Sequence, residues 1–477
     1  MKLHQLVRSS RAWRWAVGAA IVAAGGAAHA QTLSAPPPPS TTAPAPAPSL
    51  ESAPAPSPKS GGVTASIYGF VELDLMHDST QSFGEAITNN TMARPATLAG
   101  DNPRTQVSAR DSRVGVKLAS PEYGHVKTSA LIEIDFFGNQ AATATEDATF
   151  SAAAVRLRHA YVKFETPVLD VLAGHTHDLF GWGGAGFYPS TVAFLGVPGE
   201  IYHRDPQLRL SKVLSGSAAT FEIAAAAVRP AQRDGEIPDG QGGLRFALNR
   251  FLGGSVQGAG QPTAQPASIG FSGVYRRFSV PAFTASAANP NKATGWGGAA
   301  NLFLPIIPAR SRTDVGNTLS ATAEATMGTG ISNLYTGLTG GVLFPSLPNP
   351  SMTLPVPTYN PDIDEGLATY DAAGKLHTIN WRALVVGLQY RAPFNQGRTL
   401  GLSAVASQIE STNVDSLTPQ QGLSQVFSKA QYVDGNVFVS PTPESQVGAS
   451  VQIERQTFGD GVYGTNVRGE LAVYYFF

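Results

Sequence analysis

The sequence predicts an all-β protein: a transmembrane antiparallel β-barrel of about 16 strands, with one long loop folded into its interior. Three observations lead to this class. The last segment is a strand with one apolar face, the composition is rich in turn residues and poor in charge, and segments with a two-residue period recur along the chain. We expect the barrel to occupy residues 63–477.

The first residues predict export. A basic leader precedes an apolar run over residues 15–28, and residues 28–30 (Ala-His-Ala) give the small-x-small pattern of a cleavage site. We therefore expect a signal peptide over residues 1–30. The run is shorter than the roughly 20 apolar residues of a membrane-spanning helix. An uncleaved anchor is the alternative interpretation.

Residues 31–62 are rich in proline and alanine, with four consecutive prolines at Pro36–Pro39. Such a segment cannot bury a core and is expected to be extended and polyproline-like. We predict a spacer on the periplasmic side of the membrane. A tether to the cell wall or to a partner protein is the alternative.

The composition supports a barrel. The chain has 50 Gly, 35 Pro and no Cys, which favours many turns and excludes a disulfide framework. Charged residues make up 14%, against about a quarter in soluble proteins, and a lipid-facing belt explains this deficit. Lys plus Arg (33) nearly equals Asp plus Glu (34), so we expect no nucleic-acid partner. Nothing in the sequence requires a cofactor.

Strands are predicted where apolar residues alternate with polar ones. In the first, Val71, Leu73 and Leu75 share one face, and Glu72 and Asp74 share the other. The predicted strands cover residues 67–75, 112–118, 126–137, 155–166, 168–178, 207–214, 219–229, 243–250, 268–280, 298–307, 319–328, 379–392, 399–410, 427–439, 446–456 and 468–477.

The last strand is the strongest single indication. Leu471, Val473 and Tyr475 share the parity of Phe477, so one face is apolar up to the last residue. An exposed apolar edge invites aggregation in a soluble domain, whereas a closed barrel pairs its last strand with its first. A buried strand of a β-sandwich is the alternative.

The connections between these strands alternate in length. The second and third strands are joined by the short turn 120–124, and the fourth and fifth essentially by Pro167. The connections over 78–106, 138–154, 179–205 and 331–377 are long. Short turns at one rim and long loops at the other are typical of outer-membrane barrels.

Several segments carry a family resemblance, namely residues 67–74, 112–115, 156–162, 173–176 and the terminal aromatic strand. With these segments the chain resembles the general bacterial porins, and more closely the DcaP-like trimeric porins. The resemblance runs from about residue 65 to the end. It implies a homotrimer in outer-membrane lipid that passes small organic anions, and it implies that Phe477 is the end signal read by the barrel-assembly machinery. One departure is the Pro/Ala-rich segment, since DcaP-like proteins tend to carry a coiled-coil helix there.

The long connection after the fifth predicted strand is the candidate constriction loop. It contains many glycines together with Trp182, Phe187 and Tyr188. By the resemblance, the third long loop of a general porin folds into the lumen and narrows it. Glycine allows close backbone approach, and the aromatic rings can fill space. An ordinary extracellular loop is the alternative.

Charged and histidine side chains gather around this loop, and we predict that they line the pore. They are Glu72, Asp74, Arg113, Lys117, Glu133, Asp135, Arg156, Arg158, His159, His175, His177, His203, Arg204 and Arg209. Fixed cations in a lumen raise the local concentration of anions, and facing carboxylates would supply the negative side of a transverse field. The alternative is that these charges only pair with one another.

Strict alternation places Arg156 and Arg158 on the face opposite His159. We therefore expect either a β-bulge in this strand or arginines at the membrane rim.

Two weaker patterns concern metals. His175 and His177 share a face at a spacing that can hold a metal, but paired lumen histidines are commoner than metal sites. Asp362 and Asp364 lie in an acidic loop that lacks the twelve-residue calcium pattern. We expect no metal at either place.

The sequence thus predicts a passive channel for small hydrophilic solutes with a preference for anions, and not an enzyme. Two other functions compete with it: an outer-membrane hydrolase, and an adhesive or structural barrel without an open pore.

Overall fold

The computed structural model describes residues 62–86, 92–138, 153–183, 187, 188, 190–193, 197–254, 264–280, 291–337, 361–371, 373–392, 399–417, 423, 424 and 426–477. The predicted signal peptide and all but the last residue of the predicted spacer lie outside the described residues.

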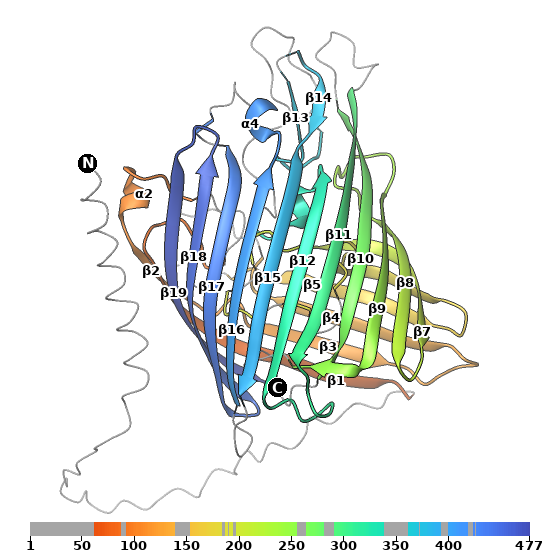
Figure 1. The fold of residues 1–477 in the computed structure, drawn as a ribbon. Helices are drawn as coiled ribbons and strands as arrows, with labels where there is room; N and C mark the ends of the chain where they lie inside the picture. Colours follow the sequence, from red (N-terminus) through yellow and green to blue (C-terminus); the bar gives the residue numbers. More distant parts are fainter. Residues whose placement is uncertain are drawn as a thin grey trace, which may run out of the picture.

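The chain forms one closed antiparallel barrel of 16 strands (Figure 1). Its strands are β1 (Thr64–Asp78), β2 (Arg104–Ser108), β3 (Arg113–Ala119), β4 (Lys127–Asp135), β5 (Arg156–Glu165), β6 (Asp170–His177), β7 (Arg204–Ser215), β8 (Ala219–Val228), β9 (Asp239–Gly253), β10 (Gln265–Val280), β11 (Asn291–Ile307), β12 (Thr318–Thr329), β15 (Asn380–Ala392), β16 (Thr399–Ser411), β17 (Phe427–Thr442), β18 (Ser445–Phe458) and β19 (Tyr463–Phe476). Sequence neighbours pair around the barrel. Segments β2 and β3 count as one interrupted strand, because both pair with β1.

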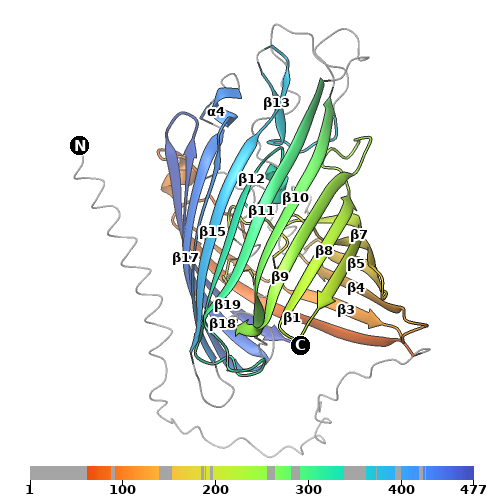
Figure 2. The ribbon, with the colours of Figure 1, turned by 45° about the vertical axis from the view of Figure 1, so that its right-hand side comes forward.

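The remaining described elements are short. They are the helices α2 (Leu98–Asp101) and α4 (Val414–Leu417), the 3-10 turn η1 (Ser332–Leu334), and the hairpin of β13 (Ala368–Tyr370) and β14 (Leu376–Thr378). Figures 1 and 2 show this hairpin beyond one rim of the barrel, at the end opposite the C terminus. None of the helices in the described part of the chain is long and apolar enough to span a bilayer.

The barrel closes where its first and last strands meet. Strand β19 pairs with β1 in a continuous antiparallel register from Phe70–Phe476 to Asp78–Arg468. The backbone of Gly69 exchanges two hydrogen bonds of 3.0 Å with Phe477. The apolar strand at the end of the sequence therefore has the partner that its sequence predicts.

The two faces of the wall differ in chemistry. Along β15, Leu384, Val386 and Leu388 point outward with 44–53% of their surface exposed, while Val385 and Gln389, at the alternate positions, are buried. The alternation recurs in β1, where Leu73 is 51% exposed. An apolar exterior and a polar interior are what a bilayer demands of a closed barrel.

The predicted strands correspond one by one to the strands of the barrel. Sequence analysis missed β2 and the β13–β14 hairpin. Segment β2 has only five residues, and the turn at 109–112 interrupts the alternation between it and β3. The hairpin strands have three residues each, too few to show a period.

Candidate functional site

The connection from β6 to β7, residues 178–203, bonds to inward-facing side chains of the barrel wall. At its start, the backbone N–H groups of Leu179 and Phe180 donate to Oε1 of Gln241 on β9, at 2.8 and 2.9 Å. The N–H of Gly181 donates to the Ser272 hydroxyl on β10 at 2.9 Å. Backbone N–H groups of the loop thus donate hydrogen bonds to side chains of two neighbouring strands.

The middle of the same loop bonds to strands farther around the barrel. The Thr191 hydroxyl donates to Asp434 on β17 at 2.7 Å, and the Val192 N–H donates to Asn436 at 3.0 Å. Near the loop's end, the N–H of Ile201 donates to Glu324 on β12 at 2.7 Å. Because these acceptors are buried, each bond replaces one that water would otherwise supply.

Apolar side chains of the loop pack on this part of the wall. Phe180 and Ile201 join a buried cluster that contains Trp381 of β15 and Tyr335. Phe187 is buried as well. The Trp182 ring is partly buried, and the Arg245 guanidinium lies over it, 4.5 Å from its centroid.

A β-bulge in β5 resolves the parity conflict among its basic residues. Opposite β4, His159 pairs with Glu133 and Leu157 with Ile134, so Arg158 is the extra residue. The bulge brings Arg158 to the interior together with His159. Of the two predicted possibilities, a β-bulge or arginines at the membrane rim, the β-bulge is the one observed at Arg158. Arg158 is buried, with 1% of its surface exposed.

The arginines of β5 pair with carboxylates on the neighbouring strand β4. Arg158 contacts Glu133 at 2.7 Å and Asp135 at 2.9 Å. Arg156 contacts Asp135 at 2.6 Å, and Arg113 of β3 lies 3.7 Å from Glu133. Glu133 and Asp135 therefore lie on the same wall as the arginines. The expectation that these two carboxylates face the cations across the lumen is wrong, because adjacent strands place the charges side by side.

Tyr202, just before β7, is the meeting point of this cluster. Its hydroxyl oxygen accepts from Arg158 at 2.9 Å and from Arg204 at 3.3 Å. Its ring lies edge-on to His177 and Tyr188, with centroids 5.0 and 5.8 Å apart. Burial alone would raise the pKa of Tyr202, but the charges of the neighbouring arginines outweigh it and lower the pKa to about 7.

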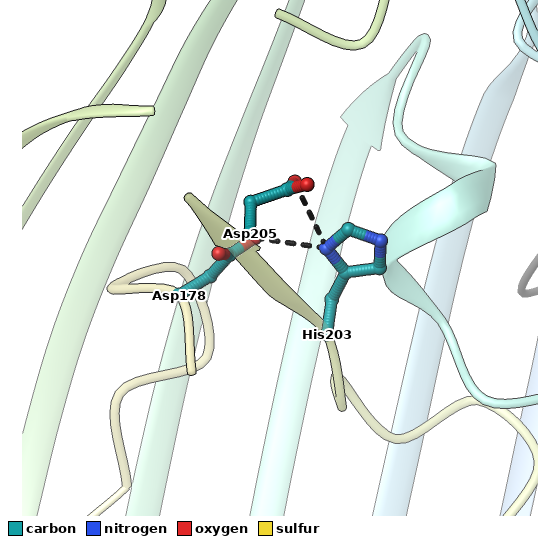
Figure 3. Close-up of side chains that lie close together, drawn as sticks. All are labelled: Asp178, His203 and Asp205. Atoms are coloured by element: carbon teal, nitrogen blue, oxygen red, sulfur yellow. Dashed lines mark hydrogen bonds and ion pairs between the residues drawn. The ribbon is translucent and has the colours of Figure 1, made fainter. Parts of the chain in front are cut away.

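His203 belongs to a second group, in which it bridges two aspartates (Figure 3). Its Nδ1 lies 3.1 Å from Asp178 and 3.2 Å from Asp205. Burial lowers the pKa of His203, but the two carboxylates raise it more, to about 10. Arg229 also contacts Asp205, at 3.1 Å, and Gln241 donates to Asp178. The three side chains have the spacing of metal ligands, but here one ring nitrogen of His203 is shared between the two carboxylates.

The other predicted basic residues lie apart from Tyr202. His159 contacts the Thr176 hydroxyl at 2.9 Å, and His175 on β6 lies near Arg204 and Asp205. Arg209 donates to Gln207 and to the His177 carbonyl. The Lys117 ammonium lies 4.3 Å from the centroid of the Tyr68 ring.

Glu72 and Asp74 of β1 form a separate acidic group with Asp111, which lies in the turn between β2 and β3.

Sequence analysis missed several polar residues of the interior. Tyr202 immediately precedes the predicted pair His203 and Arg204, so its position was a usable signal. Asp111 and Glu324 gave no such signal. Asp111 meets Glu72 and Asp74 only because a turn brings it to β1, and Glu324 meets Ile201 only because the loop crosses to β12.

Solved structures share this architecture, although no protein-family model and no curated protein matches the sequence. The outer membrane channel DcaP of Acinetobacter baumannii superposes with a TM-score of 0.60 at 18% identity, covering 88% of this chain and 99% of that chain. The chain has the fold of that channel. This confirms, at the level of fold, the resemblance to DcaP-like porins.

Two other barrels are more distant. OmpT, an outer membrane protein of Vibrio cholerae, has a TM-score of 0.46 at 9% identity, covering 88% of this chain and 99% of that chain. The anion-selective porin from Comamonas acidovorans has a TM-score of 0.45 at 10% identity, covering 87% of this chain and all of that chain. These scores are too low to add to the DcaP comparison.

Proposed function

We propose that the protein is an outer-membrane porin, a water-filled channel through which small hydrophilic solutes diffuse, with a preference for small organic anions. The observation that carries the proposal is the closed barrel of 16 strands with an apolar exterior and a polar interior. Barrels of 16–18 strands leave an aqueous passage, whereas barrels of eight strands are filled by side chains. The DcaP fold agrees with this function.

The anion preference rests on the arginine cluster. Arg113, Arg158 and Arg204 surround Tyr202, and the arginines on this wall outnumber its carboxylates Glu133 and Asp135. A net positive wall in a low-dielectric surround raises the local concentration of anions. Guanidinium groups also bind carboxylates through two parallel hydrogen bonds, in a geometry that a single ammonium cannot offer.

The loop 178–203 is proposed to narrow the channel. This is supported by the hydrogen bonds of its described residues to side chains of β9, β10, β12 and β17. The arginine cluster lies where this loop returns to β7. Solutes would therefore pass between the loop and the arginine-bearing wall, with weak binding that permits release.

Ion selectivity tests the proposal. The detergent-purified protein is inserted in a planar bilayer under a KCl gradient, and the reversal potential should show that chloride is more permeant than potassium. Arg204→Gln should shift the potential towards cations. Arg310→Gln is the matched control, because that arginine is 80% exposed in a turn outside the barrel wall and should leave selectivity unchanged.

The outcomes separate the two parts of the proposal. Absence of conductance would contradict the porin and favour an adhesive or structural barrel. Conductance with a cation preference would support the channel function and contradict the anion preference. Dicarboxylates added to one side should produce brief blockages that Arg204→Gln weakens.

We further propose a homotrimer in outer-membrane lipid, with the N-terminal spacer in the periplasm and Phe477 as the residue read by the assembly machinery. The outward apolar side chains supply the surface for lipid and for neighbouring subunits. Native mass spectrometry from detergent should give the mass of three chains.

A further inference from the structure

Three carboxyl groups meet inside the barrel close to the seam where it closes. Glu72 and Asp74 come from β1, and Asp111 comes from the turn between β2 and β3. One oxygen of each lies within 4.8 Å of an oxygen of the other two. All three side chains are buried, with at most 4% of their surface exposed.

The interruption of the second strand creates this group. Strand β1 pairs with β3 as far as Phe70 and with β2 from Asp74 onward, so residues between them have no strand partner on that side. The turn 109–112 fills the gap. Ser112 anchors it, because its hydroxyl accepts from the Glu72 N–H at 3.0 Å and donates to the Glu72 carbonyl. Asp111 is thereby held against the acidic side chains of β1.

Compensation of this group is indirect, since the charge of Arg468 reaches Asp74 without forming an ion pair with it. Glu72, Asp74 and Asp111 form no ion pair with an arginine or a lysine in the described part of the chain. A further carboxylate, Glu470, lies near Glu72 and accepts a hydrogen bond from the neutral side chain of Gln452. Arg468 instead holds Asp78 through two hydrogen bonds of 2.9 Å. Ion pairs compensate the other inner cluster, that of β4 and β5, but not this one.

Several polar atoms here are also without hydrogen bonds. Neither carboxylate oxygen of Asp74 has a hydrogen-bond partner, and one oxygen of Asp111 has none. The Tyr474 hydroxyl, from the other side of the seam, is buried, lies beside Glu72 and lacks a hydrogen bond of ordinary geometry. A buried anion without a partner is costly, and each of these atoms is a free oxygen donor for a cation.

We infer that Glu72, Asp74 and Asp111 bind a calcium ion. Ca²⁺ takes oxygen ligands at about 2.3–2.6 Å, so two ligands of one ion lie up to about 5 Å apart. The ligand set consists only of oxygens, which favours a hard cation over zinc or copper. Carboxylates can bind through one or both oxygens, and water in the lumen can complete the coordination sphere. The inference does not depend on the proposed channel function.

The ion would fix the interrupted strand to β1 beside the last strand. It would also neutralise acidic charge in the interior, so that the arginine cluster dominates the field in the pore. The site therefore links barrel closure to the charge of the lumen.

Terbium luminescence tests the site. Protein stripped with EGTA is titrated with Tb³⁺, a luminescent ion that replaces Ca²⁺, and Tyr474 should sensitise its emission. Added Ca²⁺ should quench this signal by displacement. Ca²⁺ should also raise the unfolding temperature of the stripped protein by several degrees, because it binds only the folded state.

Substitutions of the proposed ligands test where the ion binds. Asp111→Asn should weaken calcium binding about tenfold or more, since it removes one charged ligand. If Asp111→Asn does not give a folded barrel, Glu72→Gln is measured instead. Tyr474→Phe should reduce the emission while calorimetry still detects calcium binding. Asp362→Asn is the control, because Asp362 is paired with Arg233 in an exposed loop and its loss should change neither signal.

Two results would overturn the inference. One is stripped protein that binds no calcium by calorimetry, which would mean that protons alone compensate the carboxyl groups. The other is calcium binding that Asp111→Asn and Glu72→Gln leave unchanged.

Discussion

Tyr202 shows how a single residue can set the charge of an interior. Its hydroxyl lies between Arg158 and Arg204 and has a pKa of about 7, so it carries a negative charge above neutral pH and none below. A phenolate here occupies the place that a carboxylate oxygen of a solute would take. The tyrosine is therefore a built-in competitor of the anions proposed to pass.

Anion selectivity should consequently fall as pH rises. Between pH 6 and pH 9 the Tyr202 proton is lost, one positive charge of the cluster is neutralised, and the reversal potential should move towards cations. Tyr202→Phe should abolish most of this change. Glu200, whose pKa burial raises to about 8, loses its proton in the same range, so part of the slope should remain in the variant. A slope that the variant leaves intact would contradict the prediction.

Arg158 is the residue whose loss should cost the most stability. It is buried and contacts both Glu133 and Asp135, so Arg158→Ala leaves two carboxylates with reduced compensation. We expect a loss of roughly 3–5 kcal/mol in the free energy of unfolding, measured by urea-induced unfolding in lipid vesicles. Arg156→Ala is the comparison: that side chain is 26% exposed and should cost clearly less. Equal losses would show that burial does not decide the effect.

At the scale of elements, alternation predicts strands well and contacts poorly. Each long strand carries its own apolar period, so its existence can be predicted without knowledge of its neighbours. The bulge at Arg158 was one of two possibilities, because parity shows that alternation fails but not where the backbone compensates. The partners of Thr191 and Tyr202 were beyond prediction, since they are brought together by a loop that leaves one part of the wall and reaches another.

The attachment of that loop can be loosened at one point. Asn436 accepts from the Val192 N–H and donates to Asp434, so Asn436→Ala removes two hydrogen bonds at a cost of about 1–3 kcal/mol. We expect noisier single-channel currents, because the loop would leave the wall more often. Ser450→Ala is the control, since Ser450 lies on β18 and bonds to Gln452 rather than to the loop. Equal traces for both variants would mean that the loop does not border the conducting path.

At the scale of the molecule, the wall must satisfy lipid outside and charge inside. The outward residues achieve the first by being apolar, and the inward ones achieve the second by pairing, as β4 and β5 show. The composition alone anticipated this division, through its low charge content. It could not show that the basic residues of β5 pair with carboxylates of β4 while Glu72, Asp74 and Asp111 form no ion pair among the described residues. Strand register decides which side chains become neighbours.

A charge placed on the outer face should therefore be costly. Val386 lies midway along β15 and points outward. Val386→Arg should lower the free energy of unfolding in vesicles by roughly 2–4 kcal/mol, as expected near the middle of a bilayer. Val386→Ile should leave it nearly unchanged. If the arginine variant is as stable in vesicles as the native protein, this face does not contact the hydrocarbon.

The two hydrogen bonds between Gly69 and Phe477 have a consequence for biogenesis. Strands β1 and β19 come from opposite ends of the barrel sequence, so the strands between them can pair while the cylinder stays open. During that interval both edge strands are unsatisfied and need protection from other chains. This open stage ends only when the aromatic residues of β19 and Phe477 pair with β1.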